Sequence, residues 1–162
     1  MWEWRMTEHN AIAPGSGHRV GVTHRFQVRV YYEDTDAGGI VYHANYLNFA
    51  ERARTEVLRQ CGVEQDAMRR DEGAAFTVRR CEIDYRAPAR LDDVLEVRTI
   101  LRDLRGARVN AVQSIHMVKN NMVDEDWLVR LDLILACVNV KGRATRLPER
   151  VRCAFAAVLE NE

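Results

Sequence analysis

One long amphipathic helix followed by four strand-like stretches is the feature that most constrains the fold of this chain. Residues 45–60 carry their apolar side chains at helical spacing on one stripe, with most charged residues away from it. No second long helix interrupts the region that follows, and Arg105-Gly106 and Asn120-Asn121 suit turns. Strands are predicted at residues 75–86, 94–104, 108–119 and 126–140. Short connections favour an antiparallel meander packed against the helix, so the element order predicts an α+β domain.

A further strand and two shorter helices are predicted around this core. Val28, Val30 and Tyr32 alternate with less apolar neighbours, which is typical of a half-buried strand. Short helices are expected at residues 64–70 and 147–159, the second with Pro148 near its first turn. The strand that ends at Tyr32 would therefore deliver the chain directly to the start of the long helix.

The chain is expected to form one domain, residues 25–162, behind a mobile N-terminal extension, residues 1–24. The extension has no apolar run long enough for a signal sequence or a membrane span, and Gly, Pro, Ser and Asn interrupt it repeatedly. The whole chain has 162 residues, of which 47% are apolar, enough for a substantial core. Basic and acidic residues number 24 each, and no basic run interleaves with aromatics, so nothing indicates a nucleic-acid partner.

The cysteines indicate neither a metal centre nor a disulfide framework. Cys61, Cys81, Cys137 and Cys153 form no CxxC pair, and histidines do not cluster near them, so zinc-ligand spacing is absent. Three of the four lie within apolar patterns of predicted elements. We therefore expect buried, reduced thiols, no metal, no cofactor and a cytoplasmic location.

The stretch between the first strand and the long helix carries the candidate chemistry. Asp34 and Asp36 flank Thr35, two glycines follow, and Asn45 is the expected helix cap. Free N–H groups at a helix start attract developing negative charge, so a carboxylate beside them is a candidate nucleophile or general base. The alternative is that both aspartates only stabilise a turn.

The same stretch resembles a known family signature. YYEDTDAGGIVYHANY, residues 31–46, is similar to the signature of the 4-hydroxybenzoyl-CoA thioesterase branch of the hotdog superfamily. It is close to the form found in Tol-Pal-associated acyl-CoA thioesterases. The similarity continues through AERARTEVLRQCG, FTVRRCEIDYRAPARLDDVLEV and LILACVNV, over about residues 25–140. The resemblance implies a hotdog fold, an antiparallel sheet of about five strands wrapped around a long central helix.

The resemblance also implies residue roles. Asp36 matches the catalytic carboxylate, which either attacks the thioester carbonyl or activates water, whereas Asp34 holds the turn. His43 is expected to orient water, substrate or Asp36, and Tyr32 to donate a hydrogen bond at the site. Backbone N–H groups near Tyr42 and His43 are the candidates for polarising the carbonyl. The residues expected to bind the substrate are Gly39, Ile40, Val41, Tyr42 and Asn45.

The implied function is hydrolysis of acyl-CoA to the free acid and coenzyme A. Acyl carrier protein thioesters are a further expected substrate, a homodimer or homotetramer is the expected assembly, and peripheral contact with the inner membrane follows from the Tol-Pal resemblance. The alternative is a non-catalytic acyl-thioester binding or scaffold protein on the same fold. A hydratase is less favoured, because the usual histidine-bearing hydratase pattern is not visible.

Overall fold

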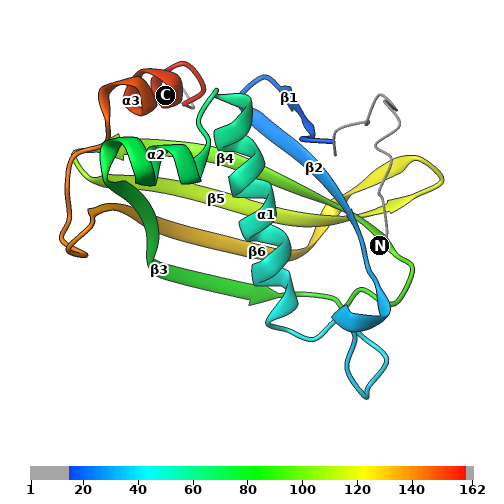
Figure 1. The fold of residues 1–162 in the computed structure, drawn as a ribbon. Coiled ribbons are helices and arrows are strands. Elements are labelled where there is room, and N and C mark those ends of the chain that lie inside the picture. The colour runs from blue at the N-terminus through cyan, green and yellow to red at the C-terminus, as the bar shows by residue number, and fades with distance from the viewer. Residues whose placement is uncertain (1–14, 160–162) are drawn as a thin grey trace, which may run out of the picture.

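The computed structural model describes residues 15–159, which form one six-stranded antiparallel sheet with a long helix lying across one face (Figure 1). The strands are β1 (His18–Val20), β2 (Thr23–Arg29), β3 (Ala74–Tyr85), β4 (Val94–Arg105), β5 (Arg108–Lys119) and β6 (Met122–Asn139). The helices are α1 (Asn45–Gln60), α2 (Gln65–Glu72) and α3 (Glu149–Ala156), and the 3-10 turn η1 spans Tyr32–Asp34. No helix in the described part of the chain is long and apolar enough to cross a membrane.

The strand order is β1-β2-β4-β5-β6-β3, which confirms only part of the predicted meander. β4, β5 and β6 are consecutive hairpin partners, and Asn120 and Asn121 both adopt positive φ in the tight turn between the last two. This turn lets β6 begin at Met122, earlier than expected. β3 does not pair with β4, because β2 occupies that edge, and it pairs with β6 instead.

The sheet takes in residues that the sequence assigned to the N-terminal extension. β1 and the first residues of β2 form a hairpin, with His18 opposite Arg25, so residues 18–24 belong to the sheet. This hairpin makes six strands where about five were expected. The first part of the predicted extension, residues 1–14, lies outside the described residues.

The first long strand ends sooner than predicted. β2 stops at Arg29, because the Val30 N–H donates to the carbonyl of Asp93 in a loop rather than to a neighbouring strand (2.9 Å). Tyr32 consequently lies in η1 and not in a strand. The prediction that Tyr32 continues the alternation of Val28 and Val30 was therefore wrong.

Helix α1 has the predicted bounds and buries the predicted face. Its apolar stripe is buried throughout and consists of Tyr46, Phe49, Ala50, Ala53 and Val57. Gln113, fully buried on β5, donates its side-chain amide to the carbonyl of Ala50 (2.9 Å) and so fixes the helix to the sheet. The helix ends in a Schellman arrangement in which Gly62, at φ +74°, donates to Arg59, and Val63 donates to Leu58.

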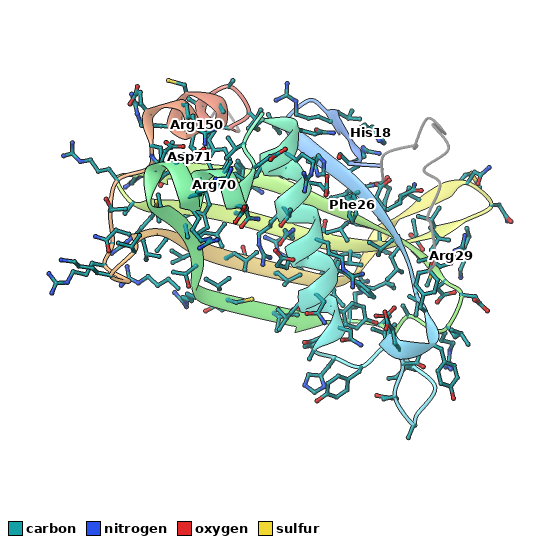
Figure 2. The ribbon with its side chains drawn as sticks, viewed as in Figure 1. His18, Phe26, Arg29, Arg70, Asp71 and Arg150 are labelled. Carbon is teal, nitrogen blue, oxygen red and sulfur yellow. The ribbon has the colours of Figure 1, made fainter. Side chains whose placement is uncertain are left out.

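Helices α2 and α3 cover the sheet at the C-terminal end of α1. Arg150 of α3 forms an ion pair with Glu72 of α2 (2.5 Å), and Figure 2 labels Arg150 on α3 above Asp71 and Arg70 on α2. Phe155 of α3 stacks on Phe76 of β3, with 5.9 Å between ring centroids. α3 is shorter than predicted and begins after Pro148, which occupies its N-cap.

The cysteines do not share one environment. Cys137 is buried, Cys61 and Cys81 are half-buried, and Cys153 is exposed on α3. Burial raises the pKa of the Cys61, Cys81 and Cys137 thiols, which favours their protonated form.

Candidate active site

A short hairpin loop projects from the sheet immediately before α1 and carries Asp36 (Figure 1). Thr35 and Val41 form the antiparallel bridge that closes it. Inside the loop the Asp36 N–H donates to the Ile40 carbonyl (2.9 Å) and the Gly39 N–H donates to the Asp36 carbonyl (3.0 Å). Gly39 adopts φ +74°, a conformation that favours glycine. The acidic turn is therefore a closed loop with defined backbone geometry.

Asp34 is the structural carboxylate of the pair. Its side chain is 6% exposed, and Oδ2 accepts a hydrogen bond from the Tyr31 N–H (2.8 Å). Its carbonyl accepts two more hydrogen bonds, from the Tyr42 N–H (2.8 Å) and from the Asn45 side-chain amide (3.0 Å). The prediction that Asp34 holds the turn is confirmed, and Asp34 also joins the loop to the start of α1.

Asp36, in contrast, is exposed and only partly engaged. Oδ1 accepts a hydrogen bond from the Gly38 N–H (2.8 Å), which orients the carboxylate across its own loop. Within residues 15–159, Oδ2 has no hydrogen-bond partner. One oxygen is thus positioned by the backbone, while the other remains available to attack a carbonyl or to accept a proton from water.

The start of α1 is not capped by a side chain. Ala44 occupies the N-cap, so the prediction of Asn45 as the cap was wrong. Asn45 is the first helical residue, and its side chain turns back to Asp34 and also accepts from Asn48 (3.0 Å). Uncapped helix termini leave N–H groups free to bind an anion.

The N–H groups of His43 and Ala44 are among the free donors at this terminus. The Tyr42 N–H, predicted as a candidate, is already donated to Asp34, and the Val41 N–H is donated to Ala89 (2.9 Å). Among the described residues, neither His43 nor Ala44 has a partner for its backbone N–H. Of the two predicted donors, the Tyr42 N–H is therefore already engaged, whereas the N–H groups of His43 and its neighbour Ala44 remain free in the described part of the chain.

Two aromatic rings contact His43, and one of them, Tyr85, links the start of α1 to β3. Its ring lies 4.5 Å from the Tyr42 ring and 6.3 Å from the Tyr85 ring, measured between centroids. The Tyr85 hydroxyl donates to the His43 carbonyl (3.0 Å). Tyr46, buried beneath them, accepts the Ala89 N–H at its hydroxyl (2.8 Å), and burial raises its pKa. Sequence reasoning missed Tyr85, because its partner lies 42 residues away and only the β3 register brings them together.

Three other predicted site residues are placed differently from one another. Tyr32 is 83% exposed and, within residues 15–159, its hydroxyl makes no hydrogen bond to Asp36, because η1 replaces the expected strand. Val41 is buried in the core, whereas Ile40 is half-buried and contributes its carbonyl to the loop.

The described part of the chain contains no group of three or more His, Cys, Asp or Glu side chains placed to hold a metal.

Comparisons with known proteins agree with this architecture. The family model of the thioesterase-like superfamily matches residues 30–155. The acyl-CoA thioester hydrolase YbgC of Escherichia coli O6:H1 is 43% identical over 132 residues, which cover 81% of this chain and 94% of that protein. The acyl-CoA thioesterase YbgC of Haemophilus influenzae is 42% identical over 131 residues, covering 80% and 92%.

A solved structure shows the same relation. The crystal structure of a probable thioesterase from Bartonella henselae superposes with a TM-score of 0.70 at 38% sequence identity, covering 78% of this chain and 99% of that one. The hotdog architecture and the thioesterase resemblance predicted from the signature at residues 31–46 are thereby confirmed. On the match over residues 30–155 and on these relatives, the chain belongs to the thioesterase-like superfamily.

Proposed function

We propose that this protein hydrolyses acyl-CoA thioesters, with Asp36 as the catalytic carboxylate and the start of α1 as the site that stabilises the oxyanion. The observation that carries the proposal is the contrast between two neighbouring aspartates, Asp34 and Asp36. Asp34 is buried and holds the backbone of the turn and the start of α1 together, whereas Asp36 is exposed, its Oδ2 has no hydrogen-bond partner among the described residues, and its loop leads directly into an uncapped helix start. The named activities of relatives at 42–43% identity support the same reaction.

Two chemical routes are compatible with this arrangement. In the first, Oδ2 of Asp36 attacks the thioester carbonyl, the C–S bond breaks, coenzyme A leaves as the thiolate, and water then hydrolyses the mixed anhydride. In the second, Asp36 takes a proton from water as that water attacks the carbonyl; the tetrahedral intermediate then breaks its C–S bond, and coenzyme A leaves as the thiolate and takes up the proton held by Asp36. Both routes place negative charge on the carbonyl oxygen, which the N–H groups of His43 and Ala44 would stabilise.

Such donors are effective because they are fixed before the reaction begins. A preorganised N–H aimed at a developing oxyanion typically contributes about a hundred- to thousandfold in rate. The His43 ring contacts those of Tyr42 and Tyr85, and the Tyr85 hydroxyl donates to the His43 carbonyl, so these contacts together orient the His43–Ala44 peptide. In this proposal His43 acts mainly through its backbone.

We also propose assembly through the free edge of β3. Within residues 15–159 this strand pairs only with β6, and its exposed residues include Val78 and Tyr85, at 47% and 42% exposure. A long unpaired edge with apolar side chains favours pairing with another strand. A second copy of the chain would cover it, giving the expected homodimer. Acyl carrier protein thioesters and peripheral contact with the inner membrane remain further proposals, supported by the resemblance alone.

An assay of the purified protein against acyl-CoAs of graded chain length tests the function. Release of free coenzyme A thiol would be followed with a thiol reagent, with bound acyl-CoA measured in parallel by calorimetry. We expect catalytic turnover with at least one length class. Binding without any thiol release across the series would contradict hydrolysis and favour the non-catalytic acyl-thioester binding protein.

A further inference from the structure

The end of β3 lies beside the start of α1 (Figure 1), and Tyr85, the last residue of β3, connects the two elements. Its hydroxyl donates a hydrogen bond to the His43 carbonyl, with 3.0 Å between the two oxygen atoms. The backbone at this point is held by β6, since β3 pairs with β6 as far as Tyr85 and the next N–H, that of Arg86, donates to the Leu128 carbonyl (2.8 Å). The hydroxyl is therefore positioned by the sheet and not by the loop that carries Asp36.

Two further aromatic contacts hold the Tyr85 ring. Its centroid lies 5.9 Å from that of Tyr46 and 6.3 Å from that of His43, both in edge-to-face geometry. Tyr46 is buried in the core, so the ring of Tyr85 rests on a fixed neighbour. Partial burial raises the pKa of Tyr85, so its hydroxyl keeps its proton at neutral pH and remains a hydrogen-bond donor.

The carbonyl that Tyr85 holds belongs to the same peptide as a candidate oxyanion donor. The His43 carbonyl and the Ala44 N–H are the two polar groups of one planar peptide unit. A hydrogen bond that fixes the direction of the carbonyl therefore also fixes the direction of the N–H. The same bond polarises the peptide, which strengthens the N–H as a donor. Among the described residues the Ala44 N–H has no acceptor, so this donor can bind a ligand.

The neighbouring donor does not depend on Tyr85. The His43 N–H belongs to the preceding peptide, whose carbonyl is that of Tyr42, and this carbonyl accepts the Asn45 N–H (2.8 Å). That hydrogen bond closes a local turn. The His43 carbonyl, in contrast, is bonded by a side chain 42 residues along the chain. A substitution at Tyr85 should therefore alter the second donor, Ala44, and leave the first in place.

Resting on the proposed function, we propose that Tyr85 is a positioning residue for hydrolysis, which holds and polarises the His43–Ala44 peptide so that the Ala44 N–H binds the oxyanion. Tyr85 acts through that peptide and does not contact the reacting atoms. A complete oxyanion donor contributes about a hundred- to thousandfold in rate. Without the hydroxyl the peptide keeps its place in the chain and loses only orientation and polarisation, so the expected loss is smaller, about tenfold.

The kinetic test compares Tyr85→Phe with the wild-type protein and with Thr77→Val. Phenylalanine keeps the ring contacts with Tyr46 and His43 and removes only the hydroxyl. We expect kcat to fall by about tenfold with KM nearly unchanged, because the oxyanion forms only in the transition state. Thr77→Val is the matched control and should keep the wild-type kcat. It removes an exposed hydroxyl from the same strand, about 25 Å from Tyr85.

Two kinetic results would overturn the inference. The first is a wild-type kcat in a Tyr85→Phe protein that remains folded by thermal melting. The second is an equal loss of kcat in Thr77→Val, since any hydroxyl on β3 would then matter as much as that of Tyr85.

A spectroscopic readout separates this inference from the hydrolase proposal. The amide ¹H and ¹⁵N resonances of Ala44 report on the hydrogen bond at the His43 carbonyl, and they are recorded by NMR without substrate. We expect Tyr85→Phe to shift both Ala44 resonances upfield from their wild-type positions. Tyr46→Phe is the control, because the Tyr46 hydroxyl accepts from the Ala89 N–H, so its loss should shift Ala89 and leave Ala44 in place.

Failure of the hydrolase proposal and failure of this inference give different results. A wild-type protein that releases no thiol from any acyl-CoA would contradict hydrolysis, and the Ala44 shift would still support the positioning of the peptide by Tyr85. Identical Ala44 resonances in wild-type and Tyr85→Phe proteins would overturn the inference whatever the rates. An Ala44 shift of the same size in Tyr46→Phe would overturn it equally.

Discussion

The two ends of α1 differ in whether their terminal backbone groups have hydrogen-bond partners. At the N-terminal end no side chain caps the helix, the His43 and Ala44 N–H groups have no partners among the described residues, and the exposed Asp36 loop lies beside them. At the C-terminal end the Schellman arrangement satisfies the last carbonyls, and Val57 and Leu58 are buried. The helix thus has free hydrogen-bond donors at its start, whereas its end is closed by hydrogen bonds and packed into the core. The difference predicts that substitutions at the start of α1 change activity, whereas substitutions at its end change stability.

After substitution of Asp36 itself, the largest effect on this comparison is expected from the His43 ring. His43→Ala keeps the backbone N–H but removes the ring contacts with Tyr42 and Tyr85, so the donor peptide loses its orientation. We expect turnover to fall by about ten- to hundredfold, the scale of a small misplacement at a reacting centre. Steady-state kinetics of His43→Ala and His43→Gln measure it.

The pair of His43 variants also tests the original expectation for the ring. Gln can replace a hydrogen bond but does not titrate near neutrality. If the ring itself transfers a proton, both variants should lose about a hundred- to ten-thousandfold. Full activity in both, with unchanged melting temperature, would exclude any role for the ring and leave Asp36 with the backbone donors.

Asp34→Ala should act on stability at the N-terminal end. It removes the acceptor of the Tyr31 N–H, and an unsatisfied group of this kind costs about 1–3 kcal/mol where water cannot replace the partner. We expect a lower free energy of unfolding, measured by urea denaturation. Asp34→Asn, which keeps an oxygen acceptor, is the control and should lose less. Equal stability of all three proteins would contradict a structural role for Asp34.

Two glycines offer a matched comparison of the two ends. Gly39 and Gly62 both have φ +74°, and a Cβ at either would meet no atom within 4 Å. Alanine at each should therefore cost about 1–2 kcal/mol of backbone strain and nothing from clashes. We expect similar losses in thermal stability, but reduced turnover only for Gly39→Ala, which lies in the Asp36 loop. Equal turnover in the two variants would show that the loop geometry does not matter for catalysis.

The smallest effect is a pH dependence at the far end of α1. Burial lowers the pKa of His24, opposed by its hydrogen bond to the Ser16 carbonyl (2.8 Å). Below about pH 6.5 the unfolded chain therefore binds the proton first, and the free energy of unfolding decreases until the lower pKa of the folded state is reached. The melting temperature of His24→Gln should therefore fall less than that of the wild-type protein between pH 7.5 and pH 5.5. An unchanged loss would exclude His24 as a contributor.

Sequence patterns predicted local features of this molecule better than long-range ones. The bounds of α1 follow from helical periodicity over sixteen residues and from Gly62, and both signals are local. The pairing of β3 with β6 and the contact of Tyr85 with His43 depend on sheet order, which no local pattern encodes. The end of β2 at Arg29 depends on Asp93, far along the chain, and this shifted Tyr32 into a turn.

In the candidate site, too, local features could be predicted from the sequence and long-range contacts could not. The signature identified Asp36, and the buried role of Asp34 agrees with a local turn. Which N–H groups remain free could not be predicted, since it depends on the Tyr42 N–H crossing to Asp34 and the Val41 N–H to Ala89.

Kinetics of Asp36→Asn, combined with binding of an S-alkyl-CoA thioether, test the central assignment most directly. Asn keeps the size of the side chain and an oxygen that can accept the Gly38 N–H, but it removes the charge that attacks or takes a proton. We predict a loss of turnover of at least about a hundredfold, with unchanged melting temperature and unchanged thioether affinity. Turnover at the wild-type level in this folded, analogue-binding variant would contradict the assignment of Asp36 as the catalytic carboxylate.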